Sequence, residues 1–177
     1  MKAIKKLNLF RNSKPVIRKF KGIEGSNAGD MPYVWDAYKK GAFKDVPEGL
    51  EMSDFIDFAD ELAALIVEAW TVEDYINGEL RPVALVLCKG TDWLIEPHVI
   101  YYDGATPRSI YRTYVAFLKK TKYRKDIGAC LVRVGKETTN LTNRVEKMGL
   151  LEFVGKIWNG SPTGNEYLYS VRCGRRA

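Results

Sequence analysis

The sequence is poor in histidine and cysteine, two residues that often bind metals and activate nucleophiles. It contains one histidine, His98, and three cysteines, with no Cys-x-x-Cys pair among them. A histidine-based metal cluster and a serine–histidine hydrolase therefore have too few residues, and a structural zinc site lacks its cysteine spacing. Cys88 and Cys130 lie in apolar, strand-like runs, which indicates reduced core thiols and favours a cytosolic origin. We predict no metal site.

Long hydrophobic runs are also absent. No run approaches the roughly 18 apolar residues that a membrane-spanning helix requires. Residues 1–10 are basic, but they lack the apolar block and the cleavage site of a secretory signal. We therefore predict a chain that is cytoplasmic when made and has no membrane partner. Its 177 residues, 46% of them hydrophobic, suit one domain with a single core. We place this domain at residues 15–173, between a basic arm (1–14) and a basic tail (174–177).

Charge is distributed unevenly along the chain. Residues 1–25 hold eight Lys or Arg against one acid, whereas residues 48–79 hold ten Asp or Glu and no Lys or Arg. Residues 103–136 are basic again, nine against two. One interpretation is solvated faces of opposite sign. The other is that residues 1–21 dock on an acidic partner, either another protein subunit of an assembly or nucleic acid. Nucleic acid would be bound without sequence readout, because the arm has few aromatics and no RNA-binding signature.

Periodicity and turn residues predict four helices and seven strands. The expected helices are residues 33–40, 52–65, 107–120 and 137–148. The expected strands are residues 15–21, 66–72, 82–88, 93–102, 125–134, 151–158 and 166–172. Asn77-Gly78 is a strong two-residue hairpin signal, and Thr106 before Pro107 is typical of a helix N-cap and first position. Ser53 is expected to cap the second helix.

Residues 93–107 contain the candidate chemistry. A strand leads into a short loop and then into a helix N-terminus, an order that presents backbone N–H groups to an anion. Glu96 and His98 are two apart on this strand, so they share a face, and Pro97 between them is compatible with a bulge. Either side chain is a candidate general base for deprotonating an amine. The alternative is a hydrogen-bonded pair that only lines the sheet.

The order of the elements resembles the fold of the GCN5-related N-acetyltransferases, the GNAT family, over residues 15–173. The most specific match is Glu146-Lys-Met-Gly-Leu150, because the last core helix of that family commonly ends Glu-Lys-x-Gly-Phe before a strand. The resemblance implies an α+β fold with a mixed, mostly antiparallel central sheet and helices on both faces. Glu96-Pro-His-Val and Ala105-Thr-Pro-Arg108 also resemble a divergent group of phage-encoded proteins of this fold.

The resemblance implies an acetyl-CoA site, and the chain departs from the family there. The implied cofactor-binding residues are Gly104, Ala105, Thr106, Arg108, Ser109 and Arg112. In the family, the glycines of Gln/Arg-x-x-Gly-x-Gly/Ala let backbone amides close on the pyrophosphate. An ungapped placement puts Thr106, Ser109 and Tyr111 on the three defining positions, so a tyrosine stands where the family has a small residue. The family's usual general acid, a tyrosine, is replaced by Val145. The remaining candidates for this acid are Tyr101, Tyr102 and Tyr167.

The resemblance to the phage-encoded group favours a binding role over catalysis, and the departures at the acetyl-CoA site support this preference. We expect a GNAT-fold protein of phage type that is mainly a structural component of a virion or another large assembly. Acetyl transfer would then be weak or lost, and no cofactor would be required. The four Trp and ten Tyr residues agree with this expectation, because both types are favoured at interfaces. The alternative is an acetyl-CoA-dependent N-acetyltransferase that acts on an amine through Glu96 or His98.

Overall fold

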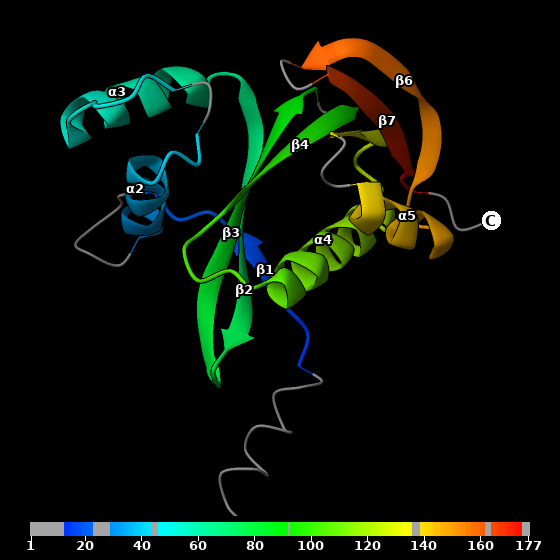
Figure 1. The fold of residues 1–177 in the computed structure, drawn as a ribbon, viewed down its shortest axis with the longest axis horizontal. Helices are drawn as coiled ribbons and strands as arrows, with labels where there is room; N and C mark the ends of the chain where they lie inside the picture. Colours follow the sequence, from blue (N-terminus) through cyan, green and yellow to red (C-terminus); the bar gives the residue numbers. More distant parts are fainter. Residues whose placement is uncertain are drawn as a thin grey trace, which may run out of the picture. The chain divides into compact units, whose positions relative to one another are not determined.

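The structure is a computed structural model of the 177-residue chain (Figure 1). It describes residues 13–22, 29–43, 46–91, 93–135, 139–161 and 164–174. Most of the predicted basic arm (1–14) and of the tail (174–177) lies outside these residues, so the predicted domain boundaries stay a prediction. The strands are β1 (Val16–Lys19), β2 (Ile66–Ile76), β3 (Glu79–Gly90), β4 (Leu94–Tyr101), β5 (Ala129–Val134), β6 (Glu152–Ser161) and β7 (Gly164–Arg172). The helices are α2 (Met31–Lys39), α3 (Met52–Ala63), α4 (Pro107–Lys122) and α5 (Thr139–Lys147).

The strands of the described residues form one mixed sheet in the order β1-β2-β3-β4-β5-β7-β6. β1 pairs antiparallel with β2, β7 pairs antiparallel with both β5 and β6, and β4 pairs parallel with β5. Asn77 and Gly78 join β2 to β3 with φ angles of 52° and 89°, the positive values that a two-residue hairpin turn requires. The predicted α+β class is confirmed: the described residues form a mixed, mostly antiparallel sheet accompanied by four helices.

The chain divides into two compact units. The first comprises the described residues up to Leu87 together with His98–Thr113, and the second comprises Cys88–Pro97 with the described residues from Tyr114 onward. In the first unit, α2 and α3 lie on the same side of β2 and β3 (Figure 1). Their apolar faces form its core, whose buried residues are Val34, Ala37, Tyr38, Val46, Phe55, Leu85 and Tyr102. Burial of this apolar surface is the main force that holds these elements together.

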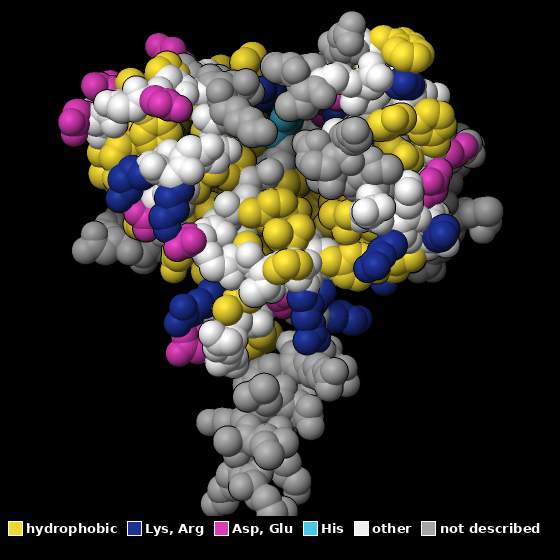
Figure 2. Space-filling view, in the orientation of Figure 1, with side chains coloured by type: hydrophobic (Ala, Val, Ile, Leu, Met, Phe, Trp, Pro, Cys, Tyr) yellow, Lys and Arg dark blue, Asp and Glu magenta, His cyan; other side chains and the backbone are white. Residues whose placement is uncertain are grey.

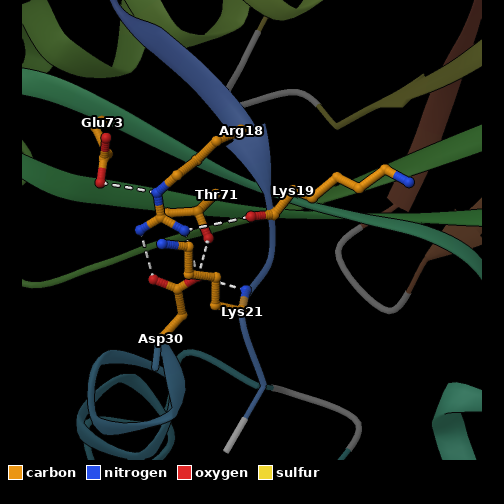
Figure 3. Close-up of polar contacts among 6 residues, drawn as sticks. All are labelled: Arg18, Lys19, Lys21, Asp30, Thr71 and Glu73. Atoms are coloured by element: carbon orange, nitrogen blue, oxygen red, sulfur yellow. Dashed lines mark hydrogen bonds and ion pairs between the residues drawn. The ribbon is translucent and has the colours of Figure 1, made fainter. Parts of the chain in front are cut away.

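A buried carboxylate, Asp30, joins three elements of the first unit (Figure 3). Its oxygens accept two hydrogen bonds from the Arg18 guanidinium of β1, both at 2.7 Å. They also accept hydrogen bonds from the Lys21 backbone N–H and from the Thr71 hydroxyl of β2, each at 2.8 Å. Arg18 in turn donates from Nε to Glu73 at 3.0 Å. Asp30 directly precedes α2, so this cluster fastens the beginning of that helix to two strands. Arg18 belongs to the segment predicted to dock on a partner, yet its charge is used within the chain.

The second helix begins at Met52 as predicted, but its predicted cap is wrong. Ser53 is not its cap, because α3 already begins at Met52 and the Phe55 N–H donates to the Glu51 carbonyl at 3.0 Å. Capping preferences locate a helix end only to within a residue or two, so a misplaced cap is a small error. Acidic side chains gather over α3 in Figure 2, where Asp54, Asp57 and Glu61 are exposed. The acidic segment predicted from the sequence therefore supplies a solvated acidic helix face.

The second unit has its own apolar core. Its buried apolar residues are Cys88, Ile95, Phe117, Leu118, Ile127, Cys130, Val132, Val134, Val145, Leu150, Leu151, Tyr169, Val171 and Cys173. Gly149, with φ of 66°, follows α5 in the left-handed conformation predicted for the residue after this helix. All three cysteines of the chain are buried and free, as their apolar surroundings indicated. Within the described part of the chain, no helix combines the length and apolar character needed to cross a membrane.

Candidate functional site

The link between β4 and α4 is a tight turn followed by a capped helix. The Ala105 N–H donates to the Tyr102 carbonyl at 3.2 Å, which closes a four-residue turn. Gly104 occupies the third position of this turn with φ of 80°, a value that favours glycine. The Tyr102 N–H donates to the Val83 carbonyl of β3 at 3.0 Å, so the sheet anchors the beginning of the turn.

Thr106 and Ser109 cap α4 by exchanging hydrogen bonds. The Ser109 N–H donates to the Thr106 hydroxyl at 3.1 Å, and the Thr106 N–H donates to the Ser109 hydroxyl at 2.8 Å. This reciprocal arrangement is that of a capping box, with serine in place of the usual acid or amide. The predicted helix start is confirmed. Three backbone donors of the link, those of Ala105, Thr106 and Ser109, are consequently satisfied within the chain.

The charges around this link favour an anion. The first turn of α4 contains no acid, and Arg108 is exposed in it. Helix N-termini normally attract acidic side chains, because the helix dipole is positive there. Asp103 is the acid of the turn, and Lys40 lies 2.6 Å from its carboxylate. The hydrogen bond and charge of Lys40 hold the pKa of Asp103 below its ordinary value. The positive end of α4 therefore carries an arginine, and the nearest acid has its own cation.

The structure places five of the six predicted cofactor residues on this link, whereas the sixth, Arg112, pairs with an acid of β2. Gly104, Ala105, Thr106, Arg108 and Ser109 all belong to the turn and the first turn of α4. Arg112, one turn later, forms an ion pair with Asp74 of β2 at 3.0 Å and also donates to the Ser13 carbonyl. The Asp74 side chain is only 3% exposed. The charge of Arg112 thus balances a buried acid, a contact across 38 positions of sequence that helix periodicity does not reveal.

The two predicted general bases both lie on β4, where Glu96 is half-buried. Its carboxylate lies 2.7 Å from Nε of Arg133 on β5, and Arg133 Nη1 lies 4.0 Å from Glu166 on β7. His98 is exposed on the same strand, β4. The structure therefore adds Arg133 and Glu166 to the charged residues around the predicted general base Glu96. Alternation along residues 129–134 would have placed Arg133 on the polar face, but it would not have shown which acids it meets.

The residue that the resemblance places at the general-acid position, Val145, cannot donate a proton. Val145 is an apolar side chain with no exposed surface. Among the substitutes, Tyr102 is buried at 4% exposure, and burial followed by the charge of Asp30 raises its pKa. Burial raises the pKa of Tyr101 to about 12. Tyr111, at the position where the family has a small residue, is half-buried on α4.

Comparison with known proteins identifies the fold. No family model matches the chain, and no curated protein matches its sequence. Among solved structures, a spermidine N-acetyltransferase from Vibrio cholerae in complex with CoA and spermine is similar, with a TM-score of 0.66 and 12% identity over 91% of this chain and 96% of that one. RimL, a ribosomal L7/L12 alpha-N-protein acetyltransferase in complex with CoA, has a TM-score of 0.64 and 9% identity over 92% and 96%. At such identities the likeness establishes the fold alone.

These neighbours correct the functional expectation. We predicted mainly a structural component of a virion or another assembly, and that prediction is wrong. The structures that resemble this chain are N-acetyltransferases, including two complexes with CoA. That prediction rested on the resemblance to phage-encoded proteins, with the missing glycine motif and general acid as further support, but a helix N-terminus or an arginine can hold an anion without that motif. The chain therefore has the fold of the GCN5-related N-acetyltransferases.

Proposed function

We propose that this chain is an N-acetyltransferase that moves an acetyl group from acetyl-CoA to an amine. The observation that carries the proposal is the cationic N-terminus of α4, with Arg108 exposed and no acid in its first turn, on a GNAT fold. Cationic and dipolar groups at a helix N-terminus favour phosphate-bearing ligands. The similar structures with CoA bound support the choice of acetyl-CoA among such ligands.

In this proposal, the link between β4 and α4 holds the diphosphate of acetyl-CoA mainly by a cationic side chain and less by unbonded backbone N–H groups. The N–H groups of Ala105, Thr106 and Ser109 are already bonded within the chain. We therefore assign the main anion contact to Arg108, supported by the dipole of α4. Gly104 has open space on the side where a Cβ would stand, so the turn leaves room for a ligand. Arg112 has a lesser role in this proposal, because Asp74 already holds its guanidinium.

The reaction needs few groups from the protein. The amine nitrogen bonds to the thioester carbonyl carbon, the carbon–sulfur bond breaks, and the sulfur leaves as a thiolate. We assign the proton released by the amine to Glu96 or His98, directly or through water. An ordinary thiol has a pKa near about 8.5, so the thiolate is a tolerable leaving group even without a protein acid. Losing a general acid typically costs about 10²–10⁴-fold in rate, so we expect a slow enzyme.

Calorimetry and a transfer assay test this proposal. Titration of the full chain with acetyl-CoA should show a dissociation constant in the micromolar range or tighter. Arg108→Ala should weaken this binding about tenfold, the effect of losing one charge-assisted hydrogen bond. Arg81→Ala is the matched control, since Arg81 lies in an exposed pair with Glu79 on β3. The absence of both binding heat and a thermal shift with acetyl-CoA would refute the proposal.

The finer resemblance to phage-encoded proteins stays a prediction. Its support is the sequence of Glu96-Pro-His-Val and of Ala105-Thr-Pro-Arg108. Docking of a partner through residues 1–21 is likewise a proposal, and most of that segment lies outside the described residues. Neither statement is needed for acetyl transfer.

A further inference from the structure

Three charged side chains from three strands meet in the second unit. Glu96 lies on β4, Arg133 on β5 and Glu166 on β7. Arg133 Nε is 2.7 Å from Oε1 of Glu96, which is hydrogen-bond distance, whereas Arg133 Nη1 is 4.0 Å from Oε2 of Glu166. The side chains are 25%, 50% and 18% exposed in the order Glu96, Arg133, Glu166. The cation therefore stands between two carboxylates and is bound closely to only one.

Strand register explains why these residues meet. β4 and β5 run parallel, with Leu94 opposite Ala129 and Ile95 opposite Cys130. On the other side of β5, Arg133 is opposite Leu168 of β7. Glu166 is two residues before Leu168, so it projects from the same face of the sheet and is a diagonal neighbour of Arg133. The middle strand thus carries the cation, and its two neighbours carry the acids.

The difference between the two Arg133–carboxylate distances indicates the role of Arg133. Guanidinium groups have several N–H donors in a rigid plane and orient a carboxylate better than an ammonium does. Glu166 does not compete at hydrogen-bond distance, since its Oε2 is buried and has no hydrogen-bond partner among the described residues. A half-exposed ion pair contributes little to stability, so support of the fold is a weak reason for this arrangement.

We propose that Arg133 is a positioning residue that fixes the Glu96 carboxylate for the acceptor amine. This inference rests on the proposed acetyl transfer and on Glu96 as the group that receives the proton of the amine. Arg133 itself exchanges no proton and forms no bond with the acetyl group. It holds one carboxylate oxygen, which sets the direction in which the carboxylate faces, while Glu166 keeps the guanidinium from turning away by charge attraction alone.

Four variants of the full chain test the role of Arg133. Transfer from acetyl-CoA to spermidine, and to a peptide with a free N-terminus, is followed by the release of CoA thiol. Glu96→Gln should lower kcat about 100-fold or more, as expected for a lost general base. Arg133→Met should also lower kcat, by about 10–100-fold, because a misdirected group loses much of its catalytic effect. Arg133→Lys should recover part of that loss. Arg81→Met, which removes an exposed arginine of β3, should leave kcat unchanged.

A purely structural role would give a different pattern. In the positioning role, the KM for acetyl-CoA stays within about twofold in Arg133→Met, and the unfolding midpoint falls by less than about 4 °C. Wild-type kcat in Arg133→Met would overturn the proposal, whether or not Glu96→Gln is impaired. So would a loss of kcat that merely follows unfolding. A wild-type chain that binds acetyl-CoA but acetylates neither amine would remove this role, while a chain that does not bind acetyl-CoA would refute the proposed function itself.

Discussion

Replacing Asp30 by Asn should destabilise the fold more than any surface change. Asp30 is 2% exposed and accepts four hydrogen bonds, two of them from the Arg18 guanidinium (Figure 3). Asparagine has nearly the same shape, but one of its two terminal atoms is a donor. That NH₂ group would face donors of Arg18, Lys21 or Thr71, whichever way the amide turned. The variant therefore removes the charge and leaves at least one buried donor without an acceptor.

The magnitude follows from the burial of the pair. Removing one partner of a buried ion pair costs about 3–5 kcal/mol. We expect about 3 kcal/mol, the lower end, because Arg18 keeps Glu73 and its side chain is 25% exposed. For a chain of this size each kcal/mol lowers the melting temperature by about 2–4 °C, so the expected drop is about 6–12 °C. Glu73→Gln is the matched control, since its amide oxygen can still accept from Arg18 Nε, and it should cost less than about 1 kcal/mol.

The pH dependence gives a second, independent test. Burial alone would raise the pKa of Asp30, but the hydrogen bonds from Arg18, Lys21 and Thr71 and the charge of Arg18 together lower it. A carboxylate with a lowered folded-state pKa adds stability above its unfolded pKa, about 3.9, and loses it as pH falls toward the folded value.

Urea denaturation of the wild type and of Asp30→Asn should therefore give a constant difference in the free energy of unfolding between about pH 5 and about pH 8. The difference should narrow below about pH 4, where the wild type begins to lose the contribution of the Asp30 charge. A melting temperature within about 2 °C of the wild type, or a difference that grows on acidification, would refute the reasoning.

Two further predictions concern buried polar groups. Burial raises the pKa of the Cys130 thiol and of the Cys173 thiol, and Cys88 is buried too. A thiol-reactive disulfide reagent at about pH 8 should therefore modify none of the three thiols in the native protein and all three in denaturant; rapid modification of one native thiol would contradict this burial. Tyr102→Phe should leave the free energy of unfolding unchanged or raise it, because the buried Tyr102 hydroxyl has no hydrogen-bond partner among the described residues. A loss above about 1 kcal/mol in urea denaturation would show that this hydroxyl is bonded.

Local signals in the sequence predicted the elements because their causes are local. Asn77-Gly78 forms the expected hairpin turn, since few other residues adopt positive φ at two successive positions. Thr106 caps α4 as expected, because N-cap and helix donors are neighbours in sequence. Ser53 lies inside α3 and was misjudged as its cap for the same reason that helix ends are hard to place: several nearby residues can serve as the cap.

The sequence by itself determined the α+β class, the order of the elements and the turn that ends β4. The order of the elements and the turn depend on periodicity or on residues within a few positions of one another, and the class followed from the resemblance of that order to the GNAT fold. Tertiary structure decided which charged side chains pair with each other. Ion pairs form between Arg112 and Asp74, between Arg18 and Asp30, and between Arg133 and Glu96. The partners of these pairs are 38, 12 and 37 positions apart, respectively. Pairing of this kind depends on strand register and on helix docking, which bring together residues whose separation in sequence carries no signal.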